Sequence, residues 1–153
     1  MNDRIYLDVC CFNRPYDDQS WLTIKLESEA KLFVQKEVLQ GTFDLVWSYM
    51  LDYENSINPY HERRNAIAKW RNVAKADVDF SEEVNETGRQ LMKLGLKNKD
   101  ALHVACALKG GCNYFLTTDK GVLNKKQYRR PPNFRYYHPS EMCVYSDISF
   151  AMH

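Results

Sequence analysis

Four acidic residues follow or open apolar segments of the sequence, where a buried charge would be costly: Asp8, Glu54, Asp100 and Asp119. An isolated carboxylate in apolar surroundings is expensive and normally becomes neutral or finds a partner. A divalent cation such as Mg²⁺ or Mn²⁺ is a shared partner that prefers oxygen ligands. Bound metal ions can activate a water molecule and stabilise the leaving oxygen of a phosphodiester. The four residues therefore indicate a metal-dependent hydrolase.

The predicted elements explain how these acids could meet. Strands are expected at 4–8, 43–47, 113–117 and 134–137, with a short one at 78–80. Helices are expected at about 20–40, 60–74, 81–95 and 99–109. This alternation predicts an α/β fold with a parallel sheet.

Ligands of open parallel sheets collect at the carboxyl ends of strands. Asp8 and Asp119 each follow a predicted strand, and Asp100 lies in the first turn of a helix, where the dipole favours negative charge. Glu54 falls on a short helix that Ser48 can cap. We expect the four carboxylates to converge on one pocket, although acids at such positions often only cap helices.

Several neighbouring residues could support this pocket. Thr117 and Thr118 could hydrogen-bond the carboxylates or a phosphate, or satisfy local backbone groups. The prediction places Thr118 and Asn13 beside the metal ligands. Arg14 is predicted to bind a phosphate as a bidentate donor, with local pairing to Asp17 or Asp18 as the alternative.

His103 lies three residues after Asp100, on the same side of the predicted helix. An Asp-x-x-His metal pair would fit that spacing. Because the neighbours of His103 are apolar, the pattern favours a hydrogen-bonded core histidine, and the predicted ligand set does not include it.

A basic stretch follows the last predicted ligand. Residues 120–140 hold six basic side chains and no acidic one, interleaved with aromatic residues in KKQYRRPPNFRYYHP (125–139). Positive grooves with aromatic stacking surfaces bind single-stranded nucleic acid. A solvated loop is the alternative. The substrate-binding residues predicted here are Lys120, Lys125, Arg129 and Arg130.

Composition is that of an ordinary globular protein. The 153 residues are 44% hydrophobic and 27% charged, which predicts a single domain over 1–153. No apolar run is long enough for a transmembrane helix, and the first residues lack a signal-peptide pattern. The five cysteines form no CxxC pair, so neither a disulfide framework nor a zinc site is expected. A cytoplasmic location without membrane association is the resulting expectation.

The ordered set of motifs resembles PIN-domain proteins, a family of metal-dependent ribonucleases that includes VapC-type toxins. The resemblance runs from about Arg4 to Pro139. It rests on IYLDVCCFNRPYDDQS (5–20), the YE pair at 53–54, KDALHVACA (99–107) and YFLTTD (114–119). The opening segment is similar to a subgroup with Asn-Arg-Pro after the first aspartate.

The resemblance implies a three-layer α/β/α sandwich with a central parallel sheet, Mg²⁺ or Mn²⁺ as cofactor, and endonucleolytic cleavage of RNA. It places Asp8, Glu54, Asp100 and Asp119 at the acidic metal site. A small antitoxin protein and a homodimer are the implied protein partners, and Trp21, Phe33 and Tyr49 could contribute to a dimer surface.

One departure from the family pattern leaves alternatives open. Val9 follows Asp8, where the family usually has Ser or Thr, so a hydroxyl that could orient metal-bound water is missing. Cys10 or Thr118 could compensate. A PIN-fold RNA- or protein-binding module with weakened catalysis is therefore one alternative. A metal-dependent phosphatase acting on small phosphoesters is another, although Asp8-Val9-Cys10 lacks a second aspartate.

Overall fold

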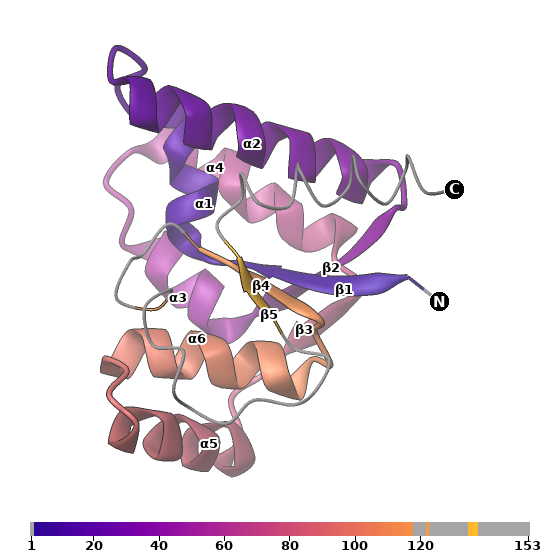
Figure 1. Ribbon diagram of the computed structural model, residues 1–153, viewed down its shortest axis with the longest axis vertical. Helices are drawn as coiled ribbons and strands as arrows, with labels where there is room; N and C mark the ends of the chain where they lie inside the picture. Colours follow the sequence, from indigo (N-terminus) through magenta and orange to yellow (C-terminus); the bar gives the residue numbers. More distant parts are fainter. Residues whose placement is uncertain (1, 118–121, 123–134, 138–153) are drawn as a thin grey trace.

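A computed structural model describes residues 2–117, 122 and 135–137 of the chain (Figure 1). Five parallel strands form one sheet in the order β3-β2-β1-β4-β5. Their bounds are β1 Asp3–Leu7, β2 Phe43–Ser48, β3 Ala76–Val78, β4 Tyr114–Leu116 and β5 Arg135–Tyr137. This architecture confirms the predicted α/β fold with a parallel sheet.

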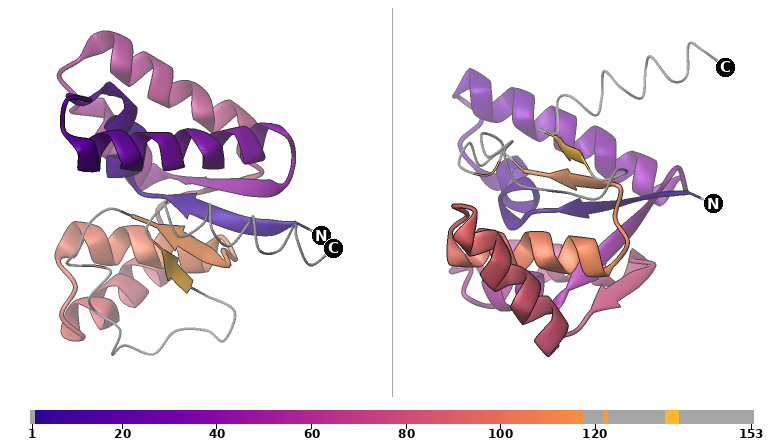
Figure 2. Two further views of the ribbon diagram at one scale, coloured as in Figure 1. Left: turned by 45° about the horizontal axis from the view of Figure 1, so that its top comes forward. Right: turned by 60° about the horizontal axis from the view of Figure 1, so that its bottom comes forward.

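Helices cover both faces of the sheet (Figures 1 and 2), with α2 and α4 on one side and α5 and α6 on the other. The helices are α1 Val9–Asn13, α2 Leu22–Leu39, α3 Tyr49–Ser56, α4 His61–Ala68, α5 Glu82–Lys93 and α6 Asn98–Lys109. Two 3₁₀ helices, η1 Arg14–Tyr16 and η2 Lys69–Val73, complete the described elements. The three predicted layers are therefore present.

Some predicted boundaries were wrong. Residues 10–18, where Asn13-Arg14-Pro15 predicts a loop, contain most of α1 and all of η1. The helix expected over 60–74 is divided into α4 and η2, and the short strand lies at 76–78 rather than 78–80. The sequence also predicts Asp18 or Ser20 as the cap of the helix that follows, but the N-cap of α2 is Trp21. Ser48 does cap α3, since its side chain accepts a hydrogen bond from the Leu51 amide (3.2 Å).

The central strands are buried on both faces, as expected for a parallel sheet between helices. Ile5, Tyr6 and Leu7 of β1 are fully buried. The end of α6 lies close to the neighbouring strands: a Cβ at Gly110 would lie 2.6 Å from Val46 Cγ1. The absence of a side chain there allows α6 to pack directly against β2.

The helical spacing of apolar residues in α2 predicts one buried stripe: Leu22, Leu26, Ala30, Phe33 and Val34. The buried face of the helix differs from this stripe. Ala30 and Val34 are buried, but Leu22 and Leu26 are 70% and 54% exposed. Lys31 is instead 1% exposed, and its Nζ lies 4.5 Å from the centroid of the Phe12 ring. Burial lowers the pKa of Lys31 to about 7. The buried face of α2 therefore includes a lysine that is only partly charged near neutral pH.

The residues suggested for a dimer surface lie in different environments. Trp21 is 66% exposed, whereas Phe33 and Tyr49 pack against the hydrophobic core. The Tyr49 ring also meets the Phe80 ring edge-on at 5.8 Å. Of the three, Trp21 presents most of its side chain at the surface of the chain.

Two compositional expectations concern the described residues directly. The cysteines placed there are free thiols, and all except Cys10 are buried: Cys11, Cys106 and Cys112. None of the described helices combines the length and apolar character needed to cross a bilayer.

Candidate metal centre

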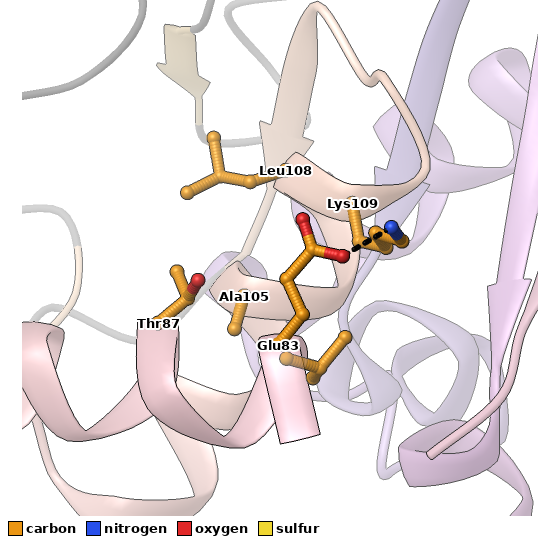
Figure 3. Close-up of a pocket in the computed structure, with 6 residues that line it drawn as sticks. Glu83, Thr87, Ala105, Leu108 and Lys109 are labelled. Atoms are coloured by element: carbon orange, nitrogen blue, oxygen red, sulfur yellow. Dashed lines mark hydrogen bonds and ion pairs between the residues drawn. The ribbon is translucent and has the colours of Figure 1, made fainter. Parts of the chain in front are cut away.

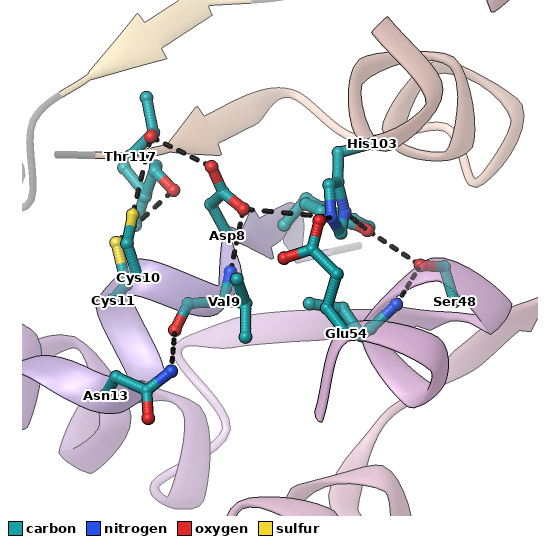
Figure 4. A network of polar contacts seen from close by, with 12 residues as sticks. Asp8, Val9, Cys10, Cys11, Asn13, Ser48, Glu54, His103 and Thr117 are labelled. Atoms are coloured by element: carbon teal, nitrogen blue, oxygen red, sulfur yellow. Dashed lines mark hydrogen bonds and ion pairs between the residues drawn. The ribbon is translucent and has the colours of Figure 1, made fainter. Parts of the chain in front are cut away.

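Asp8 lies at the carboxyl end of β1, as predicted, and is only 5% exposed. Its backbone N–H donates to the Leu116 carbonyl of β4 (3.0 Å). The carboxylate accepts two hydrogen bonds, from the Val9 amide to Oδ1 (2.8 Å) and from the Thr117 hydroxyl to Oδ2 (3.0 Å). These contacts fix Asp8 between two adjacent strand ends (Figure 4).

Glu54 and His103 meet Asp8 from two other elements. His103 Nε2, on α6, lies 2.9 Å from Glu54 Oε1, on α3, and 3.9 Å from Asp8 Oδ1. One ligand atom from each residue lies within 4.8 Å of the other two. Figure 4 shows the His103 ring and both carboxylates directed toward one another. The fold thus brings together residues separated by about a hundred positions in the sequence.

The far side of the His103 ring is held by a buried hydrogen-bonded chain. Its Nδ1 lies 2.6 Å from the Tyr6 hydroxyl, which lies 2.7 Å from Ser48 Oγ. Tyr6 also stacks on Phe115 at a centroid distance of 5.4 Å. Because Ser48 caps the helix that bears Glu54, the same chain supports two members of the cluster.

Burial and mutual charge shift the acid–base behaviour of the cluster. Burial raises the pKa of Asp8, and the Glu54 charge adds to this, while His103 and the hydrogen bonds from Thr117 and Val9 oppose it. Burial alone would lower the pKa of His103, but the Glu54 hydrogen bond and the charges of Asp8, Glu54 and Asp100 raise it. The cluster therefore favours an added positive charge.

This donor set fits a divalent metal ion. The two carboxylates supply the oxygen ligands that Mg²⁺ and Mn²⁺ prefer. A bound cation would also relieve the unfavourable burial that raises the pKa of Asp8. The geometry and the charge of the cluster thus indicate the same kind of ligand.

The structure brings together two of the four predicted acids, Asp8 and Glu54. Asp100 lies in the first turn of α6, one turn before His103, and its charge acts on that histidine. Its carboxylate is outside the group of three just described. Six predicted site residues lie outside the described part of the chain: Thr118, Asp119, Lys120, Lys125, Arg129 and Arg130.

Asn13 and Arg14 lie just beyond the cluster. The Asn13 amide donates to the Val9 carbonyl (3.3 Å) and accepts from Asn58 Nδ2 (3.1 Å), so it joins α1 to the turn before α4. It contacts these residues rather than a carboxylate of the cluster. Arg14 begins η1, and its role in phosphate binding stays a prediction.

The predicted ligand set omitted His103, and the prediction placed Thr118 rather than Thr117 beside the ligands. The preference for a buried, hydrogen-bonded histidine is confirmed, but its partners are Tyr6 and the acid Glu54 rather than ordinary core groups. The three-residue spacing from Asp100 was the available signal. Thr117 and Thr118 were both considered as hydrogen-bond partners of the carboxylates, and the Thr117 hydroxyl does donate to Asp8 Oδ2.

A separate surface hollow of about 190 Å³ lies between α5 and α6 (Figure 3). The side chains of Glu83 and Lys109 form an ion pair across it. The remaining lining residues are Val84, Thr87, Ala105 and Leu108. None of the three clustered residues lines this hollow, so it is distinct from the candidate metal centre.

Comparison with known proteins supports the fold. No protein-family model matches the sequence, and no curated protein matches it either. A solved structure with similar architecture is the crystal structure of VapBC2 from Rickettsia felis bound to a DNA fragment from their promoter. The TM-score is 0.51 at 15% identity, with 88% of this chain and 98% of that chain covered. The likeness agrees with the PIN-like α/β fold expected from the sequence.

Proposed function

We propose that this protein is a metal-dependent endoribonuclease that hydrolyses RNA phosphodiester bonds. The observation that carries the proposal is the convergence of Asp8, Glu54 and His103 at the carboxyl edge of a parallel sheet. In open α/β sheets, this edge is where ligands bind. The similarity of the fold to the VapBC2 structure adds support.

Asp8 and Glu54, with Asp100 and Asp119, would hold Mg²⁺ or Mn²⁺. When bound, the ion would lower the pKa of a coordinated water and offset the negative charge of the phosphate. The hydrogen bonds from Val9 and Thr117 hold the Asp8 carboxylate in one orientation. His103 does the same for Glu54 through its 2.9 Å contact.

The proposed substrate is single-stranded RNA. A phosphodiester approaching Asp8 and Glu54 meets like charge, so the substrate needs cationic groups at the rim as well as the metal. We assign that role to Arg14, Lys120, Lys125, Arg129 and Arg130. Aromatic residues between the basic ones would stack with exposed bases.

Cleavage of labelled RNA by variants tests the proposal. Asp8→Asn and Glu54→Gln should each lower the Mn²⁺- or Mg²⁺-dependent rate by about a hundredfold or more, because even the loss of a group supporting a ligand costs about 10- to 100-fold. Glu86→Gln is a matched control, since Glu86 pairs with Arg89 on exposed α5. Equal cleavage by the parent and Asp8→Asn proteins would refute the assignment.

A binding module with weakened catalysis is the second candidate, and Val9 is the observation that favours it. The Thr117 hydroxyl weighs against it in a different way, because its hydrogen bond to Asp8 Oδ2 holds that carboxylate in place for a metal ion. RNA binding without metal-dependent cleavage by the intact protein would identify this alternative. Turnover of nitrophenyl phosphate without RNA cleavage would instead identify a small-molecule phosphatase.

The proposal extends to protein partners. The similar structure is that of a complex, VapBC2 with promoter DNA, and by analogy we propose a small antitoxin for this chain. Such a partner would insert a basic residue near the acidic cluster and inhibit cleavage. We also propose a homodimer, for which light scattering of the purified chain should give twice the mass of one chain.

A further inference from the structure

The two nitrogens of His103 have different surroundings. Nδ1 points to the buried Tyr6 hydroxyl at 2.6 Å, whereas Nε2 points to Glu54 (2.9 Å) and Asp8 (3.9 Å). The residue is 1% exposed, so the ring has little freedom to turn. One edge of the imidazole is therefore anchored, and the other faces the acids.

This arrangement is typical of a metal-binding histidine. Such a residue usually donates its non-ligating N–H to an oxygen, which fixes the tautomer and the ring orientation. Here Nδ1–H can donate to the Tyr6 oxygen, and the Tyr6 hydroxyl can donate to Ser48 Oγ. Without a metal ion, an Nε2–H donates to Glu54 Oε1. A bound ion would take the place of that proton, and the Nε2 lone pair would then be directed at the ion between the carboxylates.

The spacing of the ligand atoms also suits direct coordination. Ligands about 2.1 Å from one ion lie roughly 3 Å apart when they subtend a right angle, and about 4.2 Å apart when opposite. The distances from His103 Nε2, 2.9 Å to Glu54 Oε1 and 3.9 Å to Asp8 Oδ1, fall in that interval. Small side-chain movements would therefore suffice to admit an ion.

We propose that His103 Nε2 is a direct ligand of the metal ion, beside Asp8 and Glu54. This inference rests on the metal site of the proposed function and refines its selectivity. Carboxylates suit Mg²⁺ and Mn²⁺, whereas an imidazole shifts a site toward first-row transition metals. The site should therefore bind Mn²⁺ and later first-row transition metals more tightly than Mg²⁺. This preference should be larger than that of a site made only of carboxylates.

The test uses untagged full-length protein loaded with Mn²⁺. Electron spin echo spectroscopy should show modulation from a directly bound imidazole nitrogen. His103→Gln should remove that modulation and lower the ratio of Mn²⁺ to Mg²⁺ affinity by about tenfold, because only the transition metal loses a favoured ligand. His61→Gln is the matched control, since His61 is exposed on α4 and hydrogen-bonds Arg64 and Asn65.

The outcomes separate this inference from the proposed function. Calorimetric Mn²⁺ binding that Asp8→Asn abolishes, without nitrogen modulation in the parent protein, would overturn the role of His103 and leave the carboxylate site standing. Modulation that persists in His103→Gln would also overturn it. Absence of any Mn²⁺ binding to the parent protein would contradict both. Because the spectrum of the parent protein decides the first outcome, a folding defect of a variant does not affect it.

Discussion

The phenol of Tyr6 and the imidazole of His103 meet edge-on, with ring centroids 5.7 Å apart and the Tyr6 hydroxyl 2.6 Å from Nδ1. This contact joins the central strand β1 to α6, on the side of His103 opposite the acids. Both residues are essentially inaccessible to solvent. The core of the protein thus fixes the position of the imidazole, and Asp8 and Glu54 lie on the opposite side of the ring.

Tyr6→Phe should preserve packing on Phe115 and remove the hydroxyl that His103 and Ser48 share. We expect the free energy of unfolding to fall by roughly 1–2 kcal/mol, since a buried polar group is left without its partner. Mn²⁺ affinity should fall about 10- to 100-fold, as the histidine loses its orienting contact. Urea denaturation and calorimetry measure the two effects. Tyr53→Phe, at a 54% exposed position, should change neither.

Thr117→Val tests the hydrogen bond to Asp8 Oδ2. The substitution keeps the shape of the side chain and removes the hydroxyl, so the Asp8 carboxylate loses an orienting donor. Mn²⁺ affinity and the rate of RNA cleavage should each fall about tenfold or more. Thr117→Ser retains the hydroxyl and should restore most of both. Full activity in Thr117→Val would show that this contact does not support the site.

The metal-free protein should show a pH dependence of stability that involves His103. The pKa of His103 is raised in the folded state. The contribution of His103 to the free energy of unfolding is therefore fully present below the unfolded-state pKa of about 6.5. This contribution is lost as the pH rises through the folded-state pKa. Stability relative to His103→Gln should therefore be larger at pH 6 than at pH 9, by on the order of 1–2 kcal/mol. Denaturation in the presence of a chelator measures this difference. An equal difference at both pH values would contradict the prediction.

Lys31 should act in the opposite direction. The pKa of Lys31 is about 7 in the folded protein, compared with 10.5 for an ordinary lysine. The stability of the protein, as far as Lys31 determines it, is therefore highest above the unfolded-state pKa, and it is lost as the pH falls toward and through the folded-state pKa. Lys31→Met should therefore raise the free energy of unfolding by more at pH 6 than at pH 10. The difference is on the order of 4 kcal/mol, since each pKa unit corresponds to about 1.4 kcal/mol. Thermal unfolding at the two pH values measures the effect. Lys36→Met, at an exposed position of the same helix, should give no such pH dependence.

The sequence was sufficient to place Asp8, because a short apolar run followed by an acid defines the end of a buried strand. Ser48 and Glu54 were predictable from a helix-capping signal and its spacing. The order of the strands was not predictable, since it depends on contacts between distant segments. That order brings α6 beside α3 and makes His103 a neighbour of Glu54.

The buried face of α2 could not be predicted from side-chain polarity, for a physical reason. Leu22 and Leu26 have helical spacing, yet they lie on the exposed side, while Lys31 is buried against Phe12. With its amide oxygen facing the donors, Gln35 accepts hydrogen bonds from Lys31 Nζ (2.5 Å) and Trp70 Nε1 (3.1 Å). These tertiary contacts hold Lys31 in a buried position despite the ordinary preference of lysine for water. A pattern based on side-chain polarity cannot anticipate them.

Ser48 links the folding of the chain to its chemistry through a single oxygen atom. The hydroxyl caps the helix that bears Glu54 and also meets the phenol behind His103. A relative that had lost metal binding would still need this serine for its helix to begin correctly. Conservation of serine at this position in relatives would therefore indicate a requirement for folding as much as for catalysis. Conservation of Glu54 would instead indicate a requirement for metal binding.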